Sequence, residues 1–195
     1  MGTLHELGIP VFWAEGKPDI DGATHRLVLD GLLDEPREFG LPELQAMATD
    51  RVSCRLTSVT RWSVRLSWEG ILFPRLLALV TPSPRTAFVK LVSHGGGYET
   101  VVRLEDLMHP RALLAVAAEG EPLPVDYGGP VRAVFPQLWG YKSAKSLIRV
   151  TLLDAYEPGY WESRGYTDSA EIEATKIHDI NTRTTRHHRG GEVLW

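Results

Sequence analysis

The stretch YGGPVRAVFPQLWGYKSAK, residues 127–145, holds the densest set of structural signals in this chain of 195 residues. A short apolar strand that contains Arg132 leads into a loop with Gly140, Ser143 and Lys145. Glycine lets the backbone approach a ligand closely, and the free N–H groups of such a turn can bind an anion. A hydroxyl and two cations suit the same ligand, although the spacing is not that of a Walker loop. The stretch predicts either an anion-binding loop or a solvated hairpin with surface lysines.

Outward from this loop, short strands and short helices follow one another in no regular order. Alternating apolar and polar residues predict the strands, and Pro74 near the start of its segment is typical of a first helical turn. Strands are expected over residues 24–33, 52–68, 85–93, 130–136 and 146–156. Helices are expected over 41–48 and 73–80, with a broken pair of short helices over 104–120. This mixture lacks the βαβ alternation of a doubly wound sheet and predicts a single α+β domain.

The two ends of the chain carry little pattern. The opening residues are rich in Gly, Pro and Asp and are expected to form an extended arm. Residues 176–195 are polar and hold His178, His187 and His188 among arginines, without the spacing of a zinc site. We therefore expect one domain over residues 1–175 and a polar C-terminal tail over 176–195.

Composition excludes several classes of protein. The chain is 43% apolar and 24% charged, which is typical of a globular protein rather than a disordered one. A net charge of −4 argues against general nucleic-acid binding, and one cysteine cannot form an internal disulfide. No basic segment followed by a long apolar run opens the chain, and no stretch approaches the roughly 18 apolar residues of a membrane span. We expect a soluble cytoplasmic protein that binds no nucleic acid and does not span a membrane.

Several segments follow one another in an order that is specific in combination. They are LVLDGLLDEP (27–36), VTRWSVRLSWEGILFPRLL (59–77), GGGYETVVRLEDL (95–107), the stretch quoted above, and EPGYWESRGY (157–166). In this order they resemble the sulfite oxidase-like molybdopterin oxidoreductases, a family that includes sulfite oxidase, plant nitrate reductase and the bacterial catalytic subunit of methionine sulfoxide reductase. The resemblance runs over residues 10–170. It implies a mixed α+β sulfite oxidase fold around a single pyranopterin-dithiolene, that is, Mo-molybdopterin.

The resemblance also implies a set of cofactor contacts. In the family, the loop at the end of the quoted stretch touches the cofactor through backbone groups and a lysine, and an arginine after Gly-Gly-Pro lies on the phosphate side. The implied contacts are Ser93, Tyr127, Arg132, Ser143, Ala144 and Lys145. Tyr127 is a departure, because the family usually has His or Asn there, although a phenol can still donate a hydrogen bond. The arm of many members carries asparagines after an aromatic pair, and these are missing after Phe12 and Trp13.

The largest departure concerns the metal. Family members read roughly H-C-V-T-x-W-S, and that cysteine thiolate binds molybdenum, whereas aligning V-T-R-W-S places Ser58 at this position. The single cysteine, Cys54, lies four residues upstream, roughly 13 Å along a strand, so we expect it to be a core residue. A serine oxygen can also bind molybdenum. The resemblance therefore implies Ser58 as the metal ligand and a catalytic residue, with Arg61 as a candidate for binding the substrate.

Two functions remain open. The first is a molybdenum-dependent oxidoreductase that transfers an oxygen atom on a small oxyanion or sulfoxide. It would act on a small-molecule substrate and need a separate electron-transfer partner, because the chain has no room for the haem domain of larger members. The second is a non-catalytic binding module that retains the fold but lacks the cysteine ligand. The intact loop favours the first function, whereas Ser58 and Tyr127 favour the second.

Overall fold

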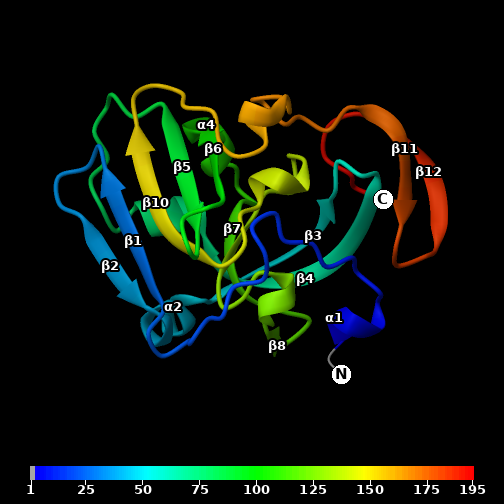
Figure 1. The fold of residues 1–195 in the computed structure, drawn as a ribbon, viewed down its shortest axis with the longest axis horizontal. Coiled ribbons are helices and arrows are strands. Elements are labelled where there is room, and N and C mark those ends of the chain that lie inside the picture. Colours follow the sequence, from blue (N-terminus) through cyan, green and yellow to red (C-terminus); the bar gives the residue numbers. More distant parts are fainter. Residues whose placement is uncertain (1–2) are drawn as a thin grey trace.

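The computed structural model describes residues 3–195, which form two β-sheets joined by short connections (Figure 1). Both sheets are mixed, because each contains parallel and antiparallel strand pairs. The five-stranded sheet has the order β2-β1-β10-β5-β6. Its strands are β1 (Arg26–Gly31), β2 (Arg37–Gly40), β5 (Phe88–Ser93), β6 (Glu99–Arg103) and β10 (Leu147–Leu153).

The seven-stranded sheet is built around one long strand, β4. Its order is β12-β11-β4-β7-β8, while β3 also pairs with β4 and β9 pairs with β7. Its strands are β3 (Asp50–Thr57), β4 (Trp62–Leu72), β7 (Leu113–Ala118), β8 (Glu121–Pro122), β9 (Arg132–Val134), β11 (Ala174–Asp179) and β12 (Thr184–Arg189). The first residues of β4 pair with β11 and its last residues pair with β7, so this strand connects both ends of the sheet.

The helices are short and lie in the connections. They are α1 (Thr3–Glu6), α2 (Leu41–Met47), α3 (Phe73–Leu77) and α4 (Leu104–Leu107), with 3₁₀ turns η1 (Val125–Tyr127), η2 (Gly140–Lys142) and η3 (Glu162–Arg164). Pro42 and Pro74 occupy the first turns of α2 and α3. A backbone N–H in a first turn has no partner within the helix, so a proline there costs no helical hydrogen bond. Across residues 3–195, no helix is both long enough and apolar enough to cross a bilayer.

Apolar side chains from both sheets share one core. Leu29 of the five-stranded sheet and Leu114 of the seven-stranded sheet belong to the same buried cluster, in which Phe73 stacks on Phe135 at 5.5 Å between ring centroids. The residues of β5 alternate between half-buried and buried, because successive side chains of a strand point to opposite faces of its sheet. One face of the five-stranded sheet therefore lies against the core. A second cluster, which includes Trp68, lies mainly on strands of the seven-stranded sheet and on the N-terminal segment.

Most of the predicted elements are confirmed, and so is the mixed α+β class. Strands lie within 24–33, 85–93, 130–136 and 146–156, and helices lie within 41–48 and 73–80. Two predictions were wrong. The strand expected over 52–68 is two antiparallel strands, β3 and β4, because the chain turns at residues 58–61, where Arg61 has a φ of 70°.

The second wrong prediction concerns residues 104–120. Only its first part is helical, as α4, whereas residues 113–118 form β7. This strand lies between β4 and β9 and is buried along nearly its whole length. A strand buried on both faces is a continuous apolar run, and hydrophobic periodicity cannot distinguish such a run from a buried helix.

The expected polar tail over 176–195 is instead part of the second sheet. Residues 174–189 form the hairpin β11–β12, which joins β4 through a short parallel pairing of His178 with Trp62. The segment after β12 folds back on the sheet and buries Val193. Few residues of this region are buried, namely Ile177, Asp179, His188 and Val193, and they stand apart from one another within a polar sequence.

Candidate functional site

A cavity of about 480 Å³ lies where the N-terminal arm meets the end of the β3–β4 hairpin and the loop 140–145. Six of the positions predicted from the sequence line it: Ser58, Ser93, Tyr127, Arg132, Ser143 and Lys145. Aromatic side chains form much of the remaining wall: Phe12, Trp13, Trp62, Tyr98, Tyr141, Trp161 and Tyr166. The cavity therefore combines an apolar wall with two cations.

Arg132 is a buried cation whose charge is not neutralised. It is 3% exposed and extends from β9 beneath the cavity. Its guanidinium donates to the carbonyl oxygens of Tyr127 at 2.7 Å and Ser143 at 3.1 Å, and it makes no ion pair within residues 3–195. Burial lowers the pKa of Arg132 to about 10, which still leaves it protonated at neutral pH. Neutral carbonyls orient this group, so its positive charge remains available to an anion.

Lys145 is the second cation, and glycine makes room for it. The stem of Lys145 passes over Gly128, where an added Cβ would lie 2.8 Å from its Cγ. Its Nζ donates to the carbonyl oxygen of Phe12 at 2.6 Å and lies 4.7 Å from the Trp13 ring centroid. Burial and then the charge of Arg132 lower the pKa of Lys145 to about 7. A bound anion would raise this pKa again, because it would supply the missing counter-charge.

Two further polar atoms at the cavity lack partners. Ser93 Oγ and Trp13 Nε1 are buried, and neither makes a hydrogen bond within the described residues. Buried polar atoms nearly always have a partner, so an orphaned hydroxyl and an orphaned indole N–H in a cavity wall indicate a ligand. Ser143 differs, because its Oγ already accepts a hydrogen bond from the Phe135 backbone N–H at 3.1 Å.

The turn between β3 and β4 presents Ser58 to the cavity. The Ser58 backbone N–H donates to Trp62 at 2.8 Å, and its carbonyl oxygen accepts from the Arg61 N–H at 2.8 Å. The Ser58 Oγ lies 2.8 Å from Thr60 Oγ1 and accepts from the Thr60 N–H at 3.2 Å. The serine oxygen is therefore held in a fixed place at the cavity wall.

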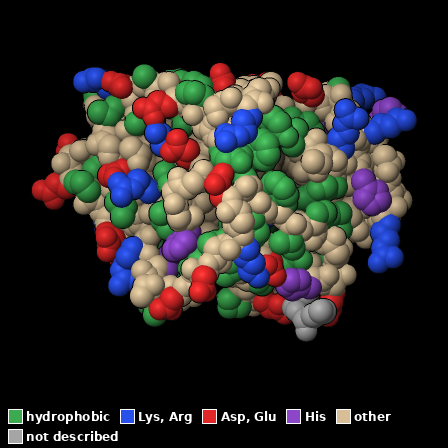
Figure 2. Space-filling model, in the orientation of Figure 1, with side chains coloured by type: hydrophobic (Ala, Val, Ile, Leu, Met, Phe, Trp, Pro, Cys, Tyr) green, Lys and Arg blue, Asp and Glu red, His purple; other side chains and the backbone are tan. Residues whose placement is uncertain are grey.

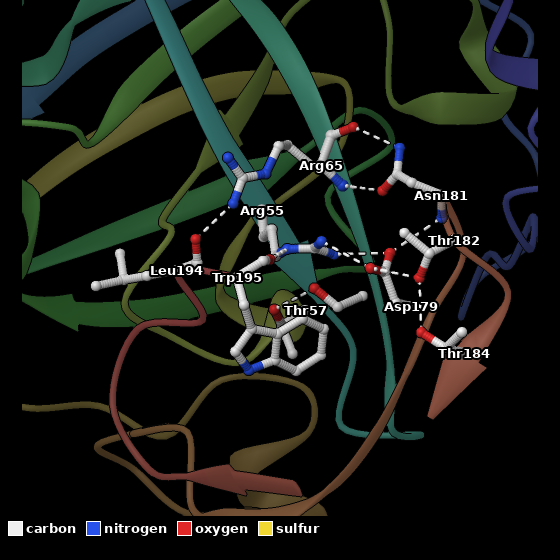
Figure 3. A network of polar contacts seen from close by, with 10 residues as sticks. Arg55, Thr57, Arg65, Asp179, Asn181, Thr182, Thr184, Leu194 and Trp195 are labelled. Carbon is white, nitrogen blue, oxygen red and sulfur yellow. Dashed lines mark hydrogen bonds and ion pairs between the residues drawn. The ribbon is translucent and has the colours of Figure 1, made fainter. Parts of the chain in front are cut away.

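The hairpin β11–β12 supports this turn through polar contacts with β3 and β4, among them the contact between Asp179 and Arg55 that Figure 3 shows. Arg55 forms two hydrogen bonds of 3.0 Å to the carboxylate of Asp179, and both side chains are almost completely buried. The His178 N–H donates to the Arg61 carbonyl oxygen at 2.9 Å. The C-terminal segment adds to the same network, since the Trp195 carbonyl oxygen accepts from Arg55 Nε. The turn that carries Ser58 is thus fixed by residues more than a hundred positions later in the sequence.

The loop at the end of the quoted stretch is buried, which rules out the solvated hairpin. Lys142 is fully buried and pairs with the equally buried Glu162. Its Nζ also donates to the Val101 carbonyl oxygen at 2.6 Å, and Thr100 Oγ1 donates to the same Glu162 oxygen at 2.6 Å. This pair joins η2 to η3 and so connects two segments that line the cavity.

Two of the predicted site residues lie outside the cavity. Ala144 is buried, and its carbonyl oxygen accepts from the Ala133 N–H at 2.9 Å, which is a backbone role in holding the loop. Arg61 is exposed in the turn and does not line the cavity. Cys54 is confirmed as a core residue, since it is 4% exposed and burial raises the pKa of its thiol to about 12. Such a thiol is unreactive.

Sequence reasoning missed most of the aromatic wall. The segment 157–166 contributes to the resemblance but supplied no predicted site residue, whereas Trp161 and Tyr166 stack at 4.9 Å between ring centroids and both line the cavity. Tyr98 was not singled out, and its hydroxyl donates to the carbonyl oxygen of Tyr141 in the loop. The density of aromatic residues in 157–166 was the available signal, but nothing local shows where that segment packs.

The donor set does not include a ready-made metal site. Within residues 3–195, no group of three or more His, Cys, Asp or Glu side chains could hold a metal ion. A metal here would need most of its ligands from a bound organic group, with at most an oxygen from Ser58. The chain's own residues fit an anionic ligand with a flat body, because aromatic rings line the walls and cations lie at one side.

Comparisons with known proteins agree with this geometry. The family described as "Oxidoreductase molybdopterin binding domain" matches residues 14–161. A putative protein-methionine-sulfoxide reductase subunit, YedZ1 of Azospira oryzae, is 30% identical over 148 residues, which cover 76% of this chain and 56% of that protein. The protein-methionine-sulfoxide reductase catalytic subunit MsrP of Ralstonia nicotianae is 30% identical over 149 residues, covering 68% of this chain and 45% of that protein.

A solved structure shows the same fold. The sulfane dehydrogenase SoxCD of Paracoccus pantotrophus superposes with a TM-score of 0.70 at 18% identity, covering 90% of this chain and 47% of that one. This chain therefore spans about half the length of the proteins that it matches.

Proposed function

The chain belongs to the oxidoreductase molybdopterin-binding domain family, and we propose that it binds Mo-molybdopterin and transfers an oxygen atom, with a sulfoxide as substrate. The observation that carries this proposal is a pair of cations beside an aromatic cavity, the buried Arg132 and the half-buried Lys145, neither of which is paired with a carboxylate within residues 3–195. Burying a charge without a counter-charge is unfavourable. The phosphate of the cofactor would supply that counter-charge.

Different residues of the chain would bind different parts of the cofactor. Arg132 and Lys145 would neutralise the phosphate, while Ser93 Oγ and Trp13 Nε1 would donate to polar atoms of the pterin. Ser58 would offer its oxygen to molybdenum from the β3–β4 turn. When bound, the cofactor supplies the two-electron oxygen-atom transfer that no side chain can perform.

The charges at the cavity favour a neutral substrate over an oxyanion. Arg132 and Lys145 are the Lys and Arg side chains that line the cavity, and both would be engaged by the cofactor. Glu15 lines the mouth and would repel an anion. Phe12 and Trp161, with ring centroids 6.3 Å apart at the rim, offer an apolar surface to the substituents of a sulfoxide. The reaction R₂SO + 2e⁻ + 2H⁺ → R₂S + H₂O takes its electrons from a separate partner and its protons from water.

The names of the relatives support this substrate class, since two of them are protein-methionine-sulfoxide reductase subunits. A second function has support from one observation. The Ser58 hydroxyl already makes a hydrogen bond with Thr60, and an alkoxide ligand would have to give up its proton. If the chain keeps the pterin but does not use Ser58 on the metal, it is a binding module rather than an enzyme. A cytoplasmic location stays a prediction from the sequence.

We expect Ser58→Ala to lose most of its molybdenum while it retains the pterin. Protein made in a host that synthesises the cofactor would be assayed for molybdenum by mass spectrometry and for pterin by fluorescence. The matched variant Ser58→Cys restores a thiolate and is expected to hold the metal at least as well as the wild type. Turnover would be compared on methionine sulfoxide and on sulfite. Equal metal content in Ser58→Ala and wild type would support the binding module, and absence of pterin from the wild type would contradict both functions.

We expect Gly128→Ala to weaken pterin binding about tenfold, the effect of losing about 1.4 kcal/mol. Gly128 has a φ of 96°, and its missing side chain leaves room for Lys145. Gly120→Ala is the matched control, because Gly120 has a φ of 81° but nothing lies within 4 Å of an added Cβ. Both variants should lose about 1–3 kcal/mol of stability through backbone strain. If the pterin content falls equally in the two variants, the room that Gly128 leaves for the Lys145 side chain is not what matters for pterin binding.

A further inference from the structure

The hairpin β11–β12, residues 174–189, is a projecting ribbon with a single sign of exposed charge. Its exposed cations are Lys176, Arg183, Arg186 and Arg189, and its single acid, Asp179, is buried against Arg55. In the space-filling view, lysines, arginines and histidines gather at the end of the molecule formed by these strands (Figure 2). The whole chain has a net charge of −4, so the basic ribbon contrasts with an otherwise acidic molecule.

The exposed cations of the ribbon are not neutralised by acidic side chains. None of the four makes an ion pair within the part of the chain that the structure describes. Exposed arginines on the five-stranded side behave differently, since Arg37 pairs with Glu43 and Arg149 pairs with Asp30. Cations without a local acidic partner are not neutralised, so their electrostatic field acts at full strength on a charged molecule that approaches from solution.

The basic ribbon is directly connected to the candidate metal position. β11 pairs with β4 through only two residue pairs, so most of the ribbon extends beyond the sheet. That short pairing joins His178 to Trp62, and the His178 N–H donates to the Arg61 carbonyl oxygen. Arg61 is exposed and lies in the same turn as Ser58. A protein seated on the ribbon would therefore lie next to the turn that would carry the metal.

We propose that the basic ribbon is the docking surface for an acidic electron-transfer protein that carries a flavin. This proposal rests on the proposed function, because a partner must supply two electrons for each sulfoxide reduced. The partner is oxidised as it delivers them, and the site accepts them before oxygen leaves as water. Opposite charges raise the association rate and orient the partner, while the acidic remainder of the chain repels it from other faces.

The observations favour a protein over a nucleic acid. Nucleic-acid bases stack mainly on exposed Phe, Tyr and Trp rings, and residues 174–189 contain none of these three residue types. A nucleic-acid site also needs a basic surface of some extent, whereas this ribbon lies on a chain whose net charge is negative. Duplex DNA therefore serves as the competing ligand in the test.

The first experiment measures binding and needs no metal. Calorimetry would follow an oxidised flavodoxin chosen for its net negative charge, at about 20 mM and about 300 mM NaCl. The test variant combines Lys176→Gln, Arg183→Asn and Arg189→Gln, where asparagine suits the positive φ of 55° at Arg183. We expect binding at low salt to weaken about tenfold in the variant, and to weaken in the wild type at high salt.

The control removes the same charge elsewhere. The triple variant Arg37→Gln, Arg51→Gln and Arg85→Gln changes exposed cations that already have acidic partners. It should bind the flavodoxin like the wild type, and thermal unfolding would show that both variants are folded. Equal loss in the two variants, or no binding by the wild type, would overturn the proposal. Duplex DNA bound through the ribbon in place of the flavodoxin would overturn it as well.

The second experiment separates this proposal from the proposed function. Methionine sulfoxide reduction would be followed with reduced flavodoxin and with reduced methyl viologen, a small cation that gains nothing from a basic surface. We expect the ribbon variant to be slowed about tenfold with flavodoxin and unchanged with viologen. No turnover with viologen in the wild type would contradict the proposed function and leave the binding result valid. Equal slowing with both donors would overturn the docking surface alone.

Discussion

Lys142→Met is expected to lower the free energy of unfolding by about 3–5 kcal/mol, because it leaves the carboxylate of Glu162 buried without its partner. Both side chains have no exposed surface. The Glu162 oxygen that accepts from Lys142 retains only the Thr100 hydroxyl, and the Val101 carbonyl oxygen loses its donor. Urea unfolding followed by tryptophan fluorescence would measure the change.

A double variant and an exposed pair serve as controls for this result. In Lys142→Met with Glu162→Leu, the unpaired charge is gone, so most of the lost stability should return. Arg51→Gln breaks an ion pair in which the arginine side chain is 67% exposed, and it should change stability by less than about 1 kcal/mol. A loss below about 1 kcal/mol in Lys142→Met would show that water reaches Glu162 and that the loop is not fixed by this pair.

The affinity for the cofactor is expected to fall about 100-fold between pH 7 and pH 9, a tenfold loss per pH unit. In the free protein, burial and then Arg132 lower the pKa of Lys145 from 10.5 to about 7. A bound phosphate would favour the ammonium form and return this pKa towards its ordinary value. Above pH 7, binding must therefore take up a proton, which becomes harder as the pH rises.

The same pKa predicts an opposite trend in the free protein. The unfolded chain binds the Lys145 proton up to about pH 10.5, whereas the folded chain releases it near pH 7, so stability should rise with pH across this window. Lys145→Arg keeps the positive charge at all these pH values. It should therefore remove most of the pH dependence of cofactor affinity and of the stability of the cofactor-free protein. Pterin retained on gel filtration at each pH would measure affinity, and thermal unfolding of cofactor-free protein would measure stability. A flat profile in the wild type would mean that Lys145 does not contact the phosphate.

Local patterns in the sequence were enough for much of the fold. Strand β5 and helix α3 could be predicted because alternation, or a proline in a first turn, is visible within a few residues. The failures share one cause, which is that the deciding partner lies far away in the chain. Strand β7 is a strand because β4 and β9 flank it, and the turn at Ser58 interrupts an alternation that continues on both sides.

The candidate site could be predicted to a similar extent. Arg132, Ser143 and Lys145, which the resemblance implies as cofactor contacts, line one cavity, and they lie on one continuous stretch of sequence. The resemblance could not show that Lys142 is buried, since its partner Glu162 belongs to a different segment. Nor could it show that Arg61 lies outside the cavity, because the local direction of a turn residue depends on the backbone of that turn.

The contact between Arg55 and Asp179 spans 124 residues of sequence, and this has a consequence for biosynthesis. A ribosome completes the cavity walls of residues 93–145 well before it reaches the hairpin that fixes the Ser58 turn. During this interval the nascent chain contains Arg132 and Lys145 but lacks the hairpin that fixes the Ser58 turn. A cofactor bound as proposed would therefore enter the finished domain, because a chain that ends before residue 174 lacks the residues that hold the Ser58 turn in place.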